Sequence, residues 1–172
     1  MAADSFDARQ LELLYARLEK PVFNVVYRWL WNTEEARDVT QEAFLKLWSA
    51  RDRVEASGAE PLLFRTALNL ASNKLRGRRL WGFLGIGAAE SEPAPAALAP
   101  EELEREQKRR AVRNAIDGLP DKLKQVVVMC ELSGLSYEQI AAALKIPVGT
   151  VGSRRSAALT KLSAVLGPLE DA

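Results

Sequence analysis

Apolar side chains recur along most of the chain at spacings of three and four residues, which brings them to one face of an α-helix. The first segment shows this pattern at Leu11, Leu14, Tyr15, Leu18, Val22, Val25, Val26, Trp29 and Leu30. Pro21 interrupts it, and because proline lacks the backbone N–H that a helix interior uses, a break or the entry to a second helix is predicted there. Strand-like alternation is scarce. The pattern therefore predicts an all-α fold.

The next two helices are indicated by the residues at their ends. Asn32 followed by Glu35 resembles a capping box, so a helix is predicted over 33–49. Residues 50–60 include Ser and Gly and predict a loop. A third helix is predicted over 61–76, because its first residue is proline, which suits the first turn, and glycine follows its end.

The stretch 81–100 has a different composition. It contains three glycines and three prolines and has no sustained apolar period, which is typical of a flexible linker. The sequence therefore predicts two small helical domains, over 5–80 and 103–168, joined by a flexible linker over 81–102. Such a connection predicts domains that are only loosely associated in the free chain.

The second unit ends in a recognisable arrangement. After two helices that reach Cys130, a capping box of Ser136 and Gln139 opens a short helix. A turn at 145–147 leads to a final helix that ends near Leu166. A short helix, a tight turn and a second helix describe a helix-turn-helix, whose second helix enters the DNA major groove. A plain helical hairpin packed in a bundle remains the alternative.

Charge is unevenly distributed, although the whole chain has a formal net charge of only +1. The net charge is −3 over 1–60, +5 over 61–89, −5 over 90–106 and +4 over 107–172. Blocks of opposite sign suit two different charged partners, one of them a nucleic acid. Solvated helix faces explain the same blocks, so charge alone does not decide between the two.

Several classes of function are disfavoured by what the chain lacks. It has no histidine and one cysteine, Cys130, so an internal disulfide is impossible and neither a metal site nor another cofactor is expected. No phosphate-binding glycine loop or paired nucleophile and base indicates an enzyme. No run of 18 apolar residues and no amino-terminal signal is present, which predicts a cytoplasmic protein with no direct membrane insertion.

Two sets of motifs resemble a known family. The segment DVTQEAFLKLW at 38–48, followed by Phe64-Arg65 and Asn69-Leu70-Ala71, resembles region two of bacterial sigma factors. The segments GLSYEQIA at 134–141 and IPVGTV at 146–151 resemble region four. Both sets stand in the family's order and cover nearly the whole chain. The short length is similar to the extracytoplasmic-function (ECF) branch of the sigma-70 family.

This resemblance implies a transcription initiation factor, not an enzyme. Such a factor binds core RNA polymerase, recognises promoter DNA at the −35 and −10 elements and assists strand opening. Members of the branch are commonly held inactive by an anti-sigma factor, whose identity the sequence does not reveal. A stand-alone helix-turn-helix regulator and a protein-binding adaptor that does not touch DNA are the alternatives.

The resemblance also implies which residues make each contact. Core polymerase is expected to bind Asp38, Gln41, Glu42, Phe44, Leu45 and Lys46. The −10 element and its separated strand are expected to meet Arg65, Asn69, Asn73, Lys74, Arg76, Arg78 and Arg79. The −35 element is expected to meet Ser136, Tyr137, Thr150, Ser153, Arg154, Arg155 and Lys161.

The recognition helix departs from the family pattern, which leaves the −35 contacts open. Lys145 stands where the turn usually has glycine, and a left-handed conformation there costs a lysine roughly 1 kcal/mol. Gly152 weakens the helix by about 1 kcal/mol relative to alanine. Arg155 occupies an inward position and must reach solvent or find a partner. Ala157 and Leu159 stand where arginines are common.

Overall fold

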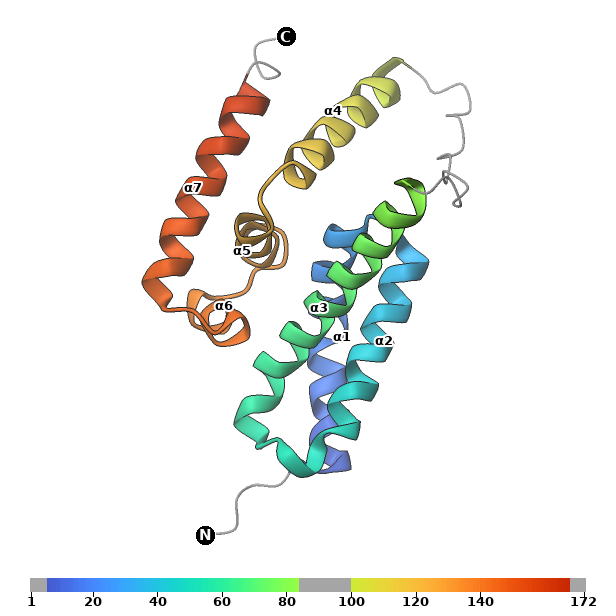
Figure 1. Ribbon diagram of the computed structural model, residues 1–172, viewed down its shortest axis with the longest axis vertical. Helices are drawn as coiled ribbons and strands as arrows, with labels where there is room; N and C mark the ends of the chain where they lie inside the picture. The colour runs from blue at the N-terminus through green and yellow to red at the C-terminus, as the bar shows by residue number, and fades with distance from the viewer. Residues whose placement is uncertain (1–5, 84–99, 168–172) are drawn as a thin grey trace.

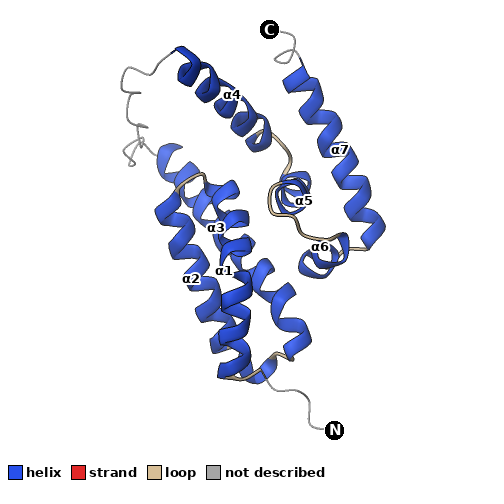
Figure 2. Cartoon of the chain, turned by 180° about the vertical axis from the view of Figure 1, so that it is seen from behind, coloured by secondary structure: helices blue, strands red, loops and turns tan. Residues whose placement is uncertain are grey.

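The computed structural model describes residues 6–83 and 100–167, and every regular element in these ranges is helical (Figures 1 and 2). The elements are α1 (Ala8–Leu30), α2 (Thr33–Ser49), a short 3₁₀ turn (Arg51–Arg53), α3 (Ala56–Phe83), α4 (Pro100–Asp117), α5 (Asp121–Glu131), α6 (Tyr137–Leu144) and α7 (Val148–Leu166). The predicted all-α fold is confirmed for the described residues.

The N-terminal domain is a bundle of α1, α2 and α3, which all contact one another. Its core is built from large side chains that are almost fully buried: Trp29, Leu30, Leu47, Leu63, Phe64 and Leu68. Each comes from the apolar stripe of its helix, as expected for amphipathic helices that face a common core.

The predicted break at Pro21 is wrong, because α1 runs without interruption from Ala8 to Leu30 with the proline inside it. Proline removes one hydrogen bond from a helix interior. Here, however, Leu18 and Val22 on either side of it are buried in the core. Packing on both sides of the proline offsets the lost bond and keeps the helix continuous.

The third helix is longer than the sequence predicts. It begins at Ala56, inside the predicted loop, and ends at Phe83, inside the predicted linker. Ala59 in its first turns is fully buried, and this packing stabilises the early start of the helix. Near its end, the Arg78 guanidinium donates to the Leu30 carbonyl at 3.1 Å and so ties the last turns to α1. Of the rest of the predicted linker, 84–99 lies outside the described residues, and 100–102 form the start of α4.

The C-terminal domain contains α4 to α7, and its helix-turn-helix forms as predicted. The Ser136 backbone N–H donates to Gln139 Oε1 at 2.8 Å, and the Gln139 backbone N–H donates to Ser136 Oγ at 3.2 Å. Lys145 ends α6 with φ 55° and ψ 49°, in the left-handed region. The predicted capping box and turn are therefore confirmed, and Lys145 adopts the conformation whose cost for a lysine was noted above.

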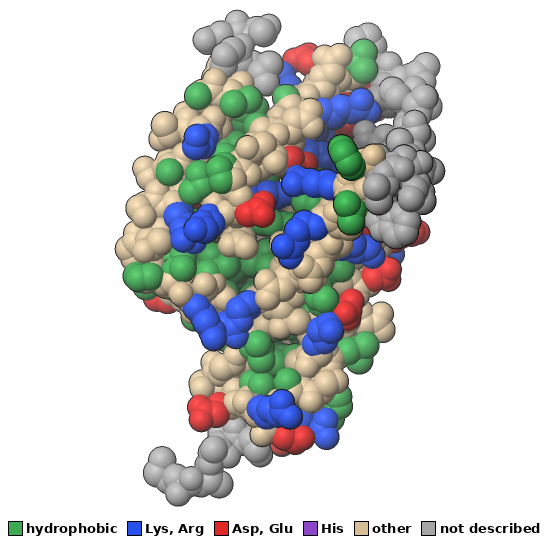
Figure 3. Space-filling model, in the orientation of Figure 1, with side chains coloured by type: hydrophobic (Ala, Val, Ile, Leu, Met, Phe, Trp, Pro, Cys, Tyr) green, Lys and Arg blue, Asp and Glu red, His purple; other side chains and the backbone are tan. Residues whose placement is uncertain are grey.

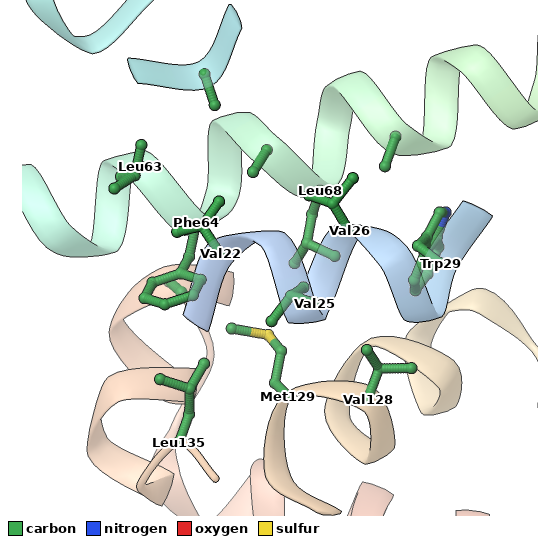
Figure 4. Close-up of a cluster of buried hydrophobic side chains, with 14 of the residues drawn as sticks. Val22, Val25, Val26, Trp29, Leu63, Phe64, Leu68, Val128, Met129 and Leu135 are labelled. Atoms are coloured by element: carbon green, nitrogen blue, oxygen red, sulfur yellow. The ribbon is translucent and has the colours of Figure 1, made fainter. Parts of the chain in front are cut away.

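The two domains pack against each other, which differs from the loose association predicted from composition. Helix α6 lies against α3, and α5 lies against α1. Figure 4 shows Met129 and Val128 of α5 directed toward Val25 and Trp29 of α1. All four are buried in one continuous apolar cluster. Linker composition reports how freely two domains can separate, whereas the complementary apolar faces decide whether they do.

Candidate functional site

The predicted polymerase-binding residues fall mainly on one side of α2. Asp38, Gln41, Glu42 and Leu45 are all exposed and, at about 100° per residue, project within an arc of roughly 100°. Leu45 is 58% exposed, which is unusual for a leucine. Lys46 is exposed beside them and pairs with Glu42 at 3.5 Å. The helix therefore presents a mixed polar and apolar face to solvent.

Phe44 is the exception within this predicted set. Its side chain is only 5% exposed, and its ring centroid lies 4.8 Å from that of Tyr15 on α1. Phe44 was expected to bind core polymerase, but a side chain buried to this extent has little surface to offer a partner. Its position on α2 points toward α1, so it supports the surface from beneath.

A groove between α1 and α2 adjoins the α2 face and has a volume of about 680 Å³. Gln41 and Leu45 belong both to the predicted contact face and to this groove. Its apolar lining includes Tyr15, Phe23 and Trp48. Tyr15 belongs to the apolar pattern of the first segment, yet its side chain is 46% exposed. The sequence signal for this groove was the apolar stripe on α1, which is wider than the core of the domain requires.

The predicted −10 residues separate into two groups on α3. Arg65, Asn69, Asn73, Arg76 and Arg79 project within an arc of about 120°. All are exposed except Arg65, which is half-buried. Within the described residues, Arg65 and Arg79 have no acidic partner, and Arg76 donates only to the Asn73 side chain. Figure 3 shows Lys and Arg side chains along this side of the molecule.

Lys74 and Arg78 occupy the opposite side of α3, where both approach Glu35 at the start of α2. The Arg78 guanidinium lies 3.2 Å from the Glu35 carboxylate, and the Lys74 ammonium lies 3.9 Å from it. The same Glu35 supplies the backbone N–H that Asn32 caps at 2.9 Å. These two cations therefore connect helices within the domain, where they share the one carboxylate of Glu35.

The −35 residues on α7 share one face of the helix. Thr150, Ser153, Arg154, Ala157 and Lys161 project within an arc of about 100°. Ser153 and Lys161 are exposed, and Thr150 and Arg154 are half-buried. Val151 and Ala158 project roughly 90–110° away from the middle of this face and are fully buried. Small hydroxyl-bearing side chains beside an arginine can approach phosphates and base edges.

Arg155 does not join this face. It projects toward α5, where its guanidinium pairs with the Glu131 carboxylate. This hydrogen bond and the negative charge of Glu131 raise the pKa of Arg155 further above its usual range. The expected need for a partner is thus met inside the domain, which leaves Arg154 and Lys161 as the cations on the outward face of α7.

Ser136 and Tyr137 stand at the start of α6. Ser136 is exposed, but its side chain and backbone are engaged in the capping box. The Tyr137 ring lies against α7, where a Cβ added to Gly152 would stand 3.6 Å from the ring carbon Cε2. Tyr137 is therefore a packing residue between the two helices of the motif, with only part of its surface available to a ligand.

The described residues hold no other evident chemical site. No group of three or more acidic, cysteine or histidine side chains within them could hold a metal ion. Cys130 is half-buried, and burial raises the pKa of its thiol. No described helix combines the length and the apolar character needed to cross a bilayer.

Both domains match known families. The sigma-70 region 2 family matches residues 14–80, and the sigma-70 region 4 family matches residues 109–162. The RNA polymerase sigma-H factor of Pseudomonas aeruginosa is 33% identical over 95% of this chain and 89% of its own length. The ECF RNA polymerase sigma-E factor of Escherichia coli is 35% identical over 86% of this chain and 82% of its own. The chain belongs to the ECF branch of the sigma-70 family.

Two solved structures have the same fold as this sigma factor. CnrH in complex with the cytosolic domain of CnrY superimposes with a TM-score of 0.67 at 24% identity, covering 96% of this chain and 93% of that one. The sigma factor RpoE of Bartonella quintana, in complex with the anti-sigma factor NepR, gives a TM-score of 0.65 at 21% identity, covering 93% and 98%. Sigma factors are transcription factors, and the match of both domains does not favour a stand-alone regulator.

Proposed function

We propose that this sigma factor directs core RNA polymerase to specific promoters and divides the task among three helices. The face of α2 binds core polymerase, the solvent side of α3 binds the −10 element, and the outward face of α7 binds the −35 element. The observation that carries the proposal is that the region 2 and region 4 matches fall, in order, on separate domains. In both domains the residues that match family motifs include exposed polar groups.

The α2 face suits a protein partner more than a nucleic acid. It combines the acidic Asp38 and Glu42 with the exposed Leu45, and it borders the apolar groove. Acidic groups repel phosphate, whereas an apolar groove with a polar rim is typical of protein recognition. These features support the assignment of this surface to polymerase.

The solvent side of α3 suits the −10 element. Three arginines supply attraction to phosphates, and two asparagines supply donors and acceptors for base edges. Strand opening requires unstacked bases to be held, and cations along a helix track the backbone of a separated strand. The 3₁₀ turn Arg51–Arg53 adjoins the start of α3, and there the Arg51 guanidinium lies 4.5 Å from the Trp48 ring centroid.

A run-off transcription assay tests the proposal directly. Purified core RNA polymerase and a library of promoter DNA are incubated with and without the chain. The proposal expects start sites that appear only when the chain is added, and sequencing them yields the promoter. If the chain binds core polymerase but starts no transcript, the α7 assignment fails. If it neither binds core nor starts transcripts, the function itself is refuted.

We also propose that an anti-sigma factor regulates this chain. The two solved relatives described above were captured with CnrY and with the anti-sigma factor NepR. The groove between α1 and α2 offers an apolar surface that overlaps the proposed polymerase contact at Gln41 and Leu45. A protein bound there would exclude polymerase, so competition between a candidate partner and core polymerase for the purified chain is the measurement that checks it.

A further inference from the structure

The groove between α1 and α2 has charged side chains around its apolar lining. Glu12 and Glu19 line it on the α1 side, and Arg37 lines it on the α2 side. All three side chains are exposed, and within the described residues none of them is paired with a group of opposite charge. Charges that surround an apolar surface and have no partner in their own chain are available to a bound protein.

These three charges occupy defined positions along the groove. Helices α1 and α2 are joined by a short turn and run antiparallel (Figure 1). The Tyr15 ring of α1 contacts the Phe44 ring of α2, which sets the register of the two helices. From this register, Glu19 and Arg37 lie toward the turn that joins the helices, on opposite walls, and Glu12 lies toward the other end. Glu12 and Glu19 are about 10 Å apart along one side of α1.

The walls of the groove favour a helix as its occupant. The lining residues extend from Ala8 to Phe23 on α1 and from Arg37 to Trp48 on α2. The groove is therefore about 16–22 Å long, which is the length of three to four helical turns. The backbone groups of both walls are hydrogen-bonded within their own helices, so an extended segment would find no main-chain partners there. A helix, in contrast, packs its side chains into a groove between two others.

The charges around the groove indicate which side chains such a helix carries. Its apolar stripe would contact the aromatic lining, while basic side chains on the edge that faces α1 would meet Glu12 and Glu19. An acidic side chain on the edge that faces α2 would meet Arg37. With the opposite signs, like charges would lie against each other, which is how interfaces reject wrong partners. The two carboxylates also disfavour a nucleic acid in this groove.

We propose that the groove selects its partner by charge, and that it binds an amphipathic helix with a basic edge facing α1 and an acidic residue facing Arg37. This inference rests on the proposed regulation by a protein bound in the groove, and it adds the residues that distinguish one such protein from another. Glu12, Glu19 and Arg37 are all outside the predicted polymerase-binding set. Recognition of the regulator and of polymerase therefore depends on different charged side chains, and the two surfaces share Gln41 and Leu45.

Two synthetic peptides test the selection at Arg37. Each has about 16 residues, with leucines at spacings of three and four, lysines on the edge that faces α1 and a hydrocarbon staple on its outer side. They differ at one position of the other edge, which is glutamate in the first peptide and lysine in the second. Fluorescence anisotropy of each labelled peptide with the full chain measures its dissociation constant. We expect the glutamate peptide to bind about tenfold more tightly.

Charge reversal in the chain provides the decisive comparison. We expect Arg37→Glu to bind the lysine peptide more tightly than the glutamate peptide, so that the order of the two affinities reverses. Lys20→Glu makes the same change in net charge at an exposed position of α1 outside the groove lining, and this control keeps the wild-type order. Damage to the fold lowers both affinities and does not reverse their order. Equal affinities in the wild-type chain, an unchanged order in Arg37→Glu, or no binding of either peptide would overturn the proposal.

The α1 side of the groove is tested separately. Glu12→Gln with Glu19→Gln removes both carboxylates, so we expect it to weaken the two peptides equally, by about tenfold, and to keep their order. Unchanged affinity would refute the basic edge of the partner. Sedimentation of the chain without peptide provides a further check. A dimer that Arg37→Glu dissociates would assign the groove to a second copy of the chain and overturn the proposal.

Run-off transcription separates this inference from the proposed function. Core polymerase and promoter DNA are incubated with the wild-type or the Arg37→Glu chain and increasing amounts of the glutamate peptide, and each chain without peptide is its own reference. We expect the peptide to inhibit the wild-type chain at concentrations about tenfold lower than the variant. Equal inhibition of both chains, or inhibition of neither, would refute regulation through Arg37. A wild-type chain that starts no transcript without peptide would instead refute the proposed function, while peptide binding still reports on the groove.

Discussion

Helices α3 and α7 are both assigned to DNA, yet they are built in different ways. Helix α3 packs against a core of large side chains that includes Phe64 and Leu68. It carries cations on two sides, one set paired with Glu35 and the other facing solvent. Helix α7 is anchored by the small Val151 and Ala158, and one of its three cations, Arg155, is paired with Glu131.

This difference indicates how the two contacts gain affinity. A helix with several unpaired arginines binds phosphates through counterion release and therefore depends steeply on salt. A helix with one arginine among hydroxyl groups and alanines gains its DNA affinity more from the fit of individual contacts and less from charge. We expect the −10 contact to supply most of the electrostatic affinity and the −35 contact to contribute mainly through position.

The largest expected effect comes from removing the solvent-side charge of α3. Substitution of Arg65, Arg76 and Arg79 by alanine should lower the slope of log affinity against log salt by about 2–3 units, one per lost phosphate contact. Fluorescence anisotropy of the holoenzyme with promoter DNA over a range of salt concentrations measures it. Lys74→Ala with Arg78→Ala is the matched control, since these cations are paired inside the domain. An equal fall in slope for that control would contradict the division of α3 into two sides.

A smaller effect separates the neighbouring arginines of α7. Arg154→Ala should weaken −35 binding by about 1–3 kcal/mol and leave thermal stability unchanged, because its side chain is on the outward face. Arg155→Ala should lower the unfolding midpoint, since it removes the partner of Glu131, and leave promoter affinity unchanged. Affinity and thermal unfolding are measured on both variants. The comparison fails if Arg155→Ala loses as much affinity as Arg154→Ala.

The smallest effect concerns the glycine inside α7. Gly152→Ala should raise stability by about 1 kcal/mol, or roughly 2–4 °C in the unfolding midpoint, because alanine favours the helical backbone. The added Cβ would meet the Tyr137 ring at an ordinary distance of 3.6 Å. Differential scanning calorimetry checks this. A lower midpoint would mean that close packing between α6 and α7 requires glycine.

Features that depend on a few neighbouring residues were predictable from the sequence. The capping box of Ser136 and Gln139 forms both of its hydrogen bonds. Lys145 stands at the turn position where the resembled family usually has glycine, and it does adopt the left-handed conformation considered for it. Both are local, because the groups involved are at most a few residues apart. The all-α class followed from apolar periodicity for the same reason.

Features that depend on distant residues were not predictable in this way. The continuity of α1 through Pro21 depends on core packing around it. The burial of Phe44 depends on where Tyr15 of another helix lies. The sequence indicated that Arg155 must reach solvent or find a partner, but not that the partner is Glu131 on α5.

Apolar spacing, capping residues and turn chemistry were sufficient to indicate the all-α class and the helix-turn-helix, because each acts over a few residues. They did not fix the continuity of α1 or the ends of α3. Which cations face solvent and which are paired with an acidic group was decided by helix packing, since Lys74 and Arg78 differ from Arg65 and Arg79 only in the neighbour that they meet. The joining of the two domains was decided in the same way. Lys124 reads as an ordinary surface lysine until Trp29, 95 residues away in sequence, covers it, because burial is a property of the assembled fold.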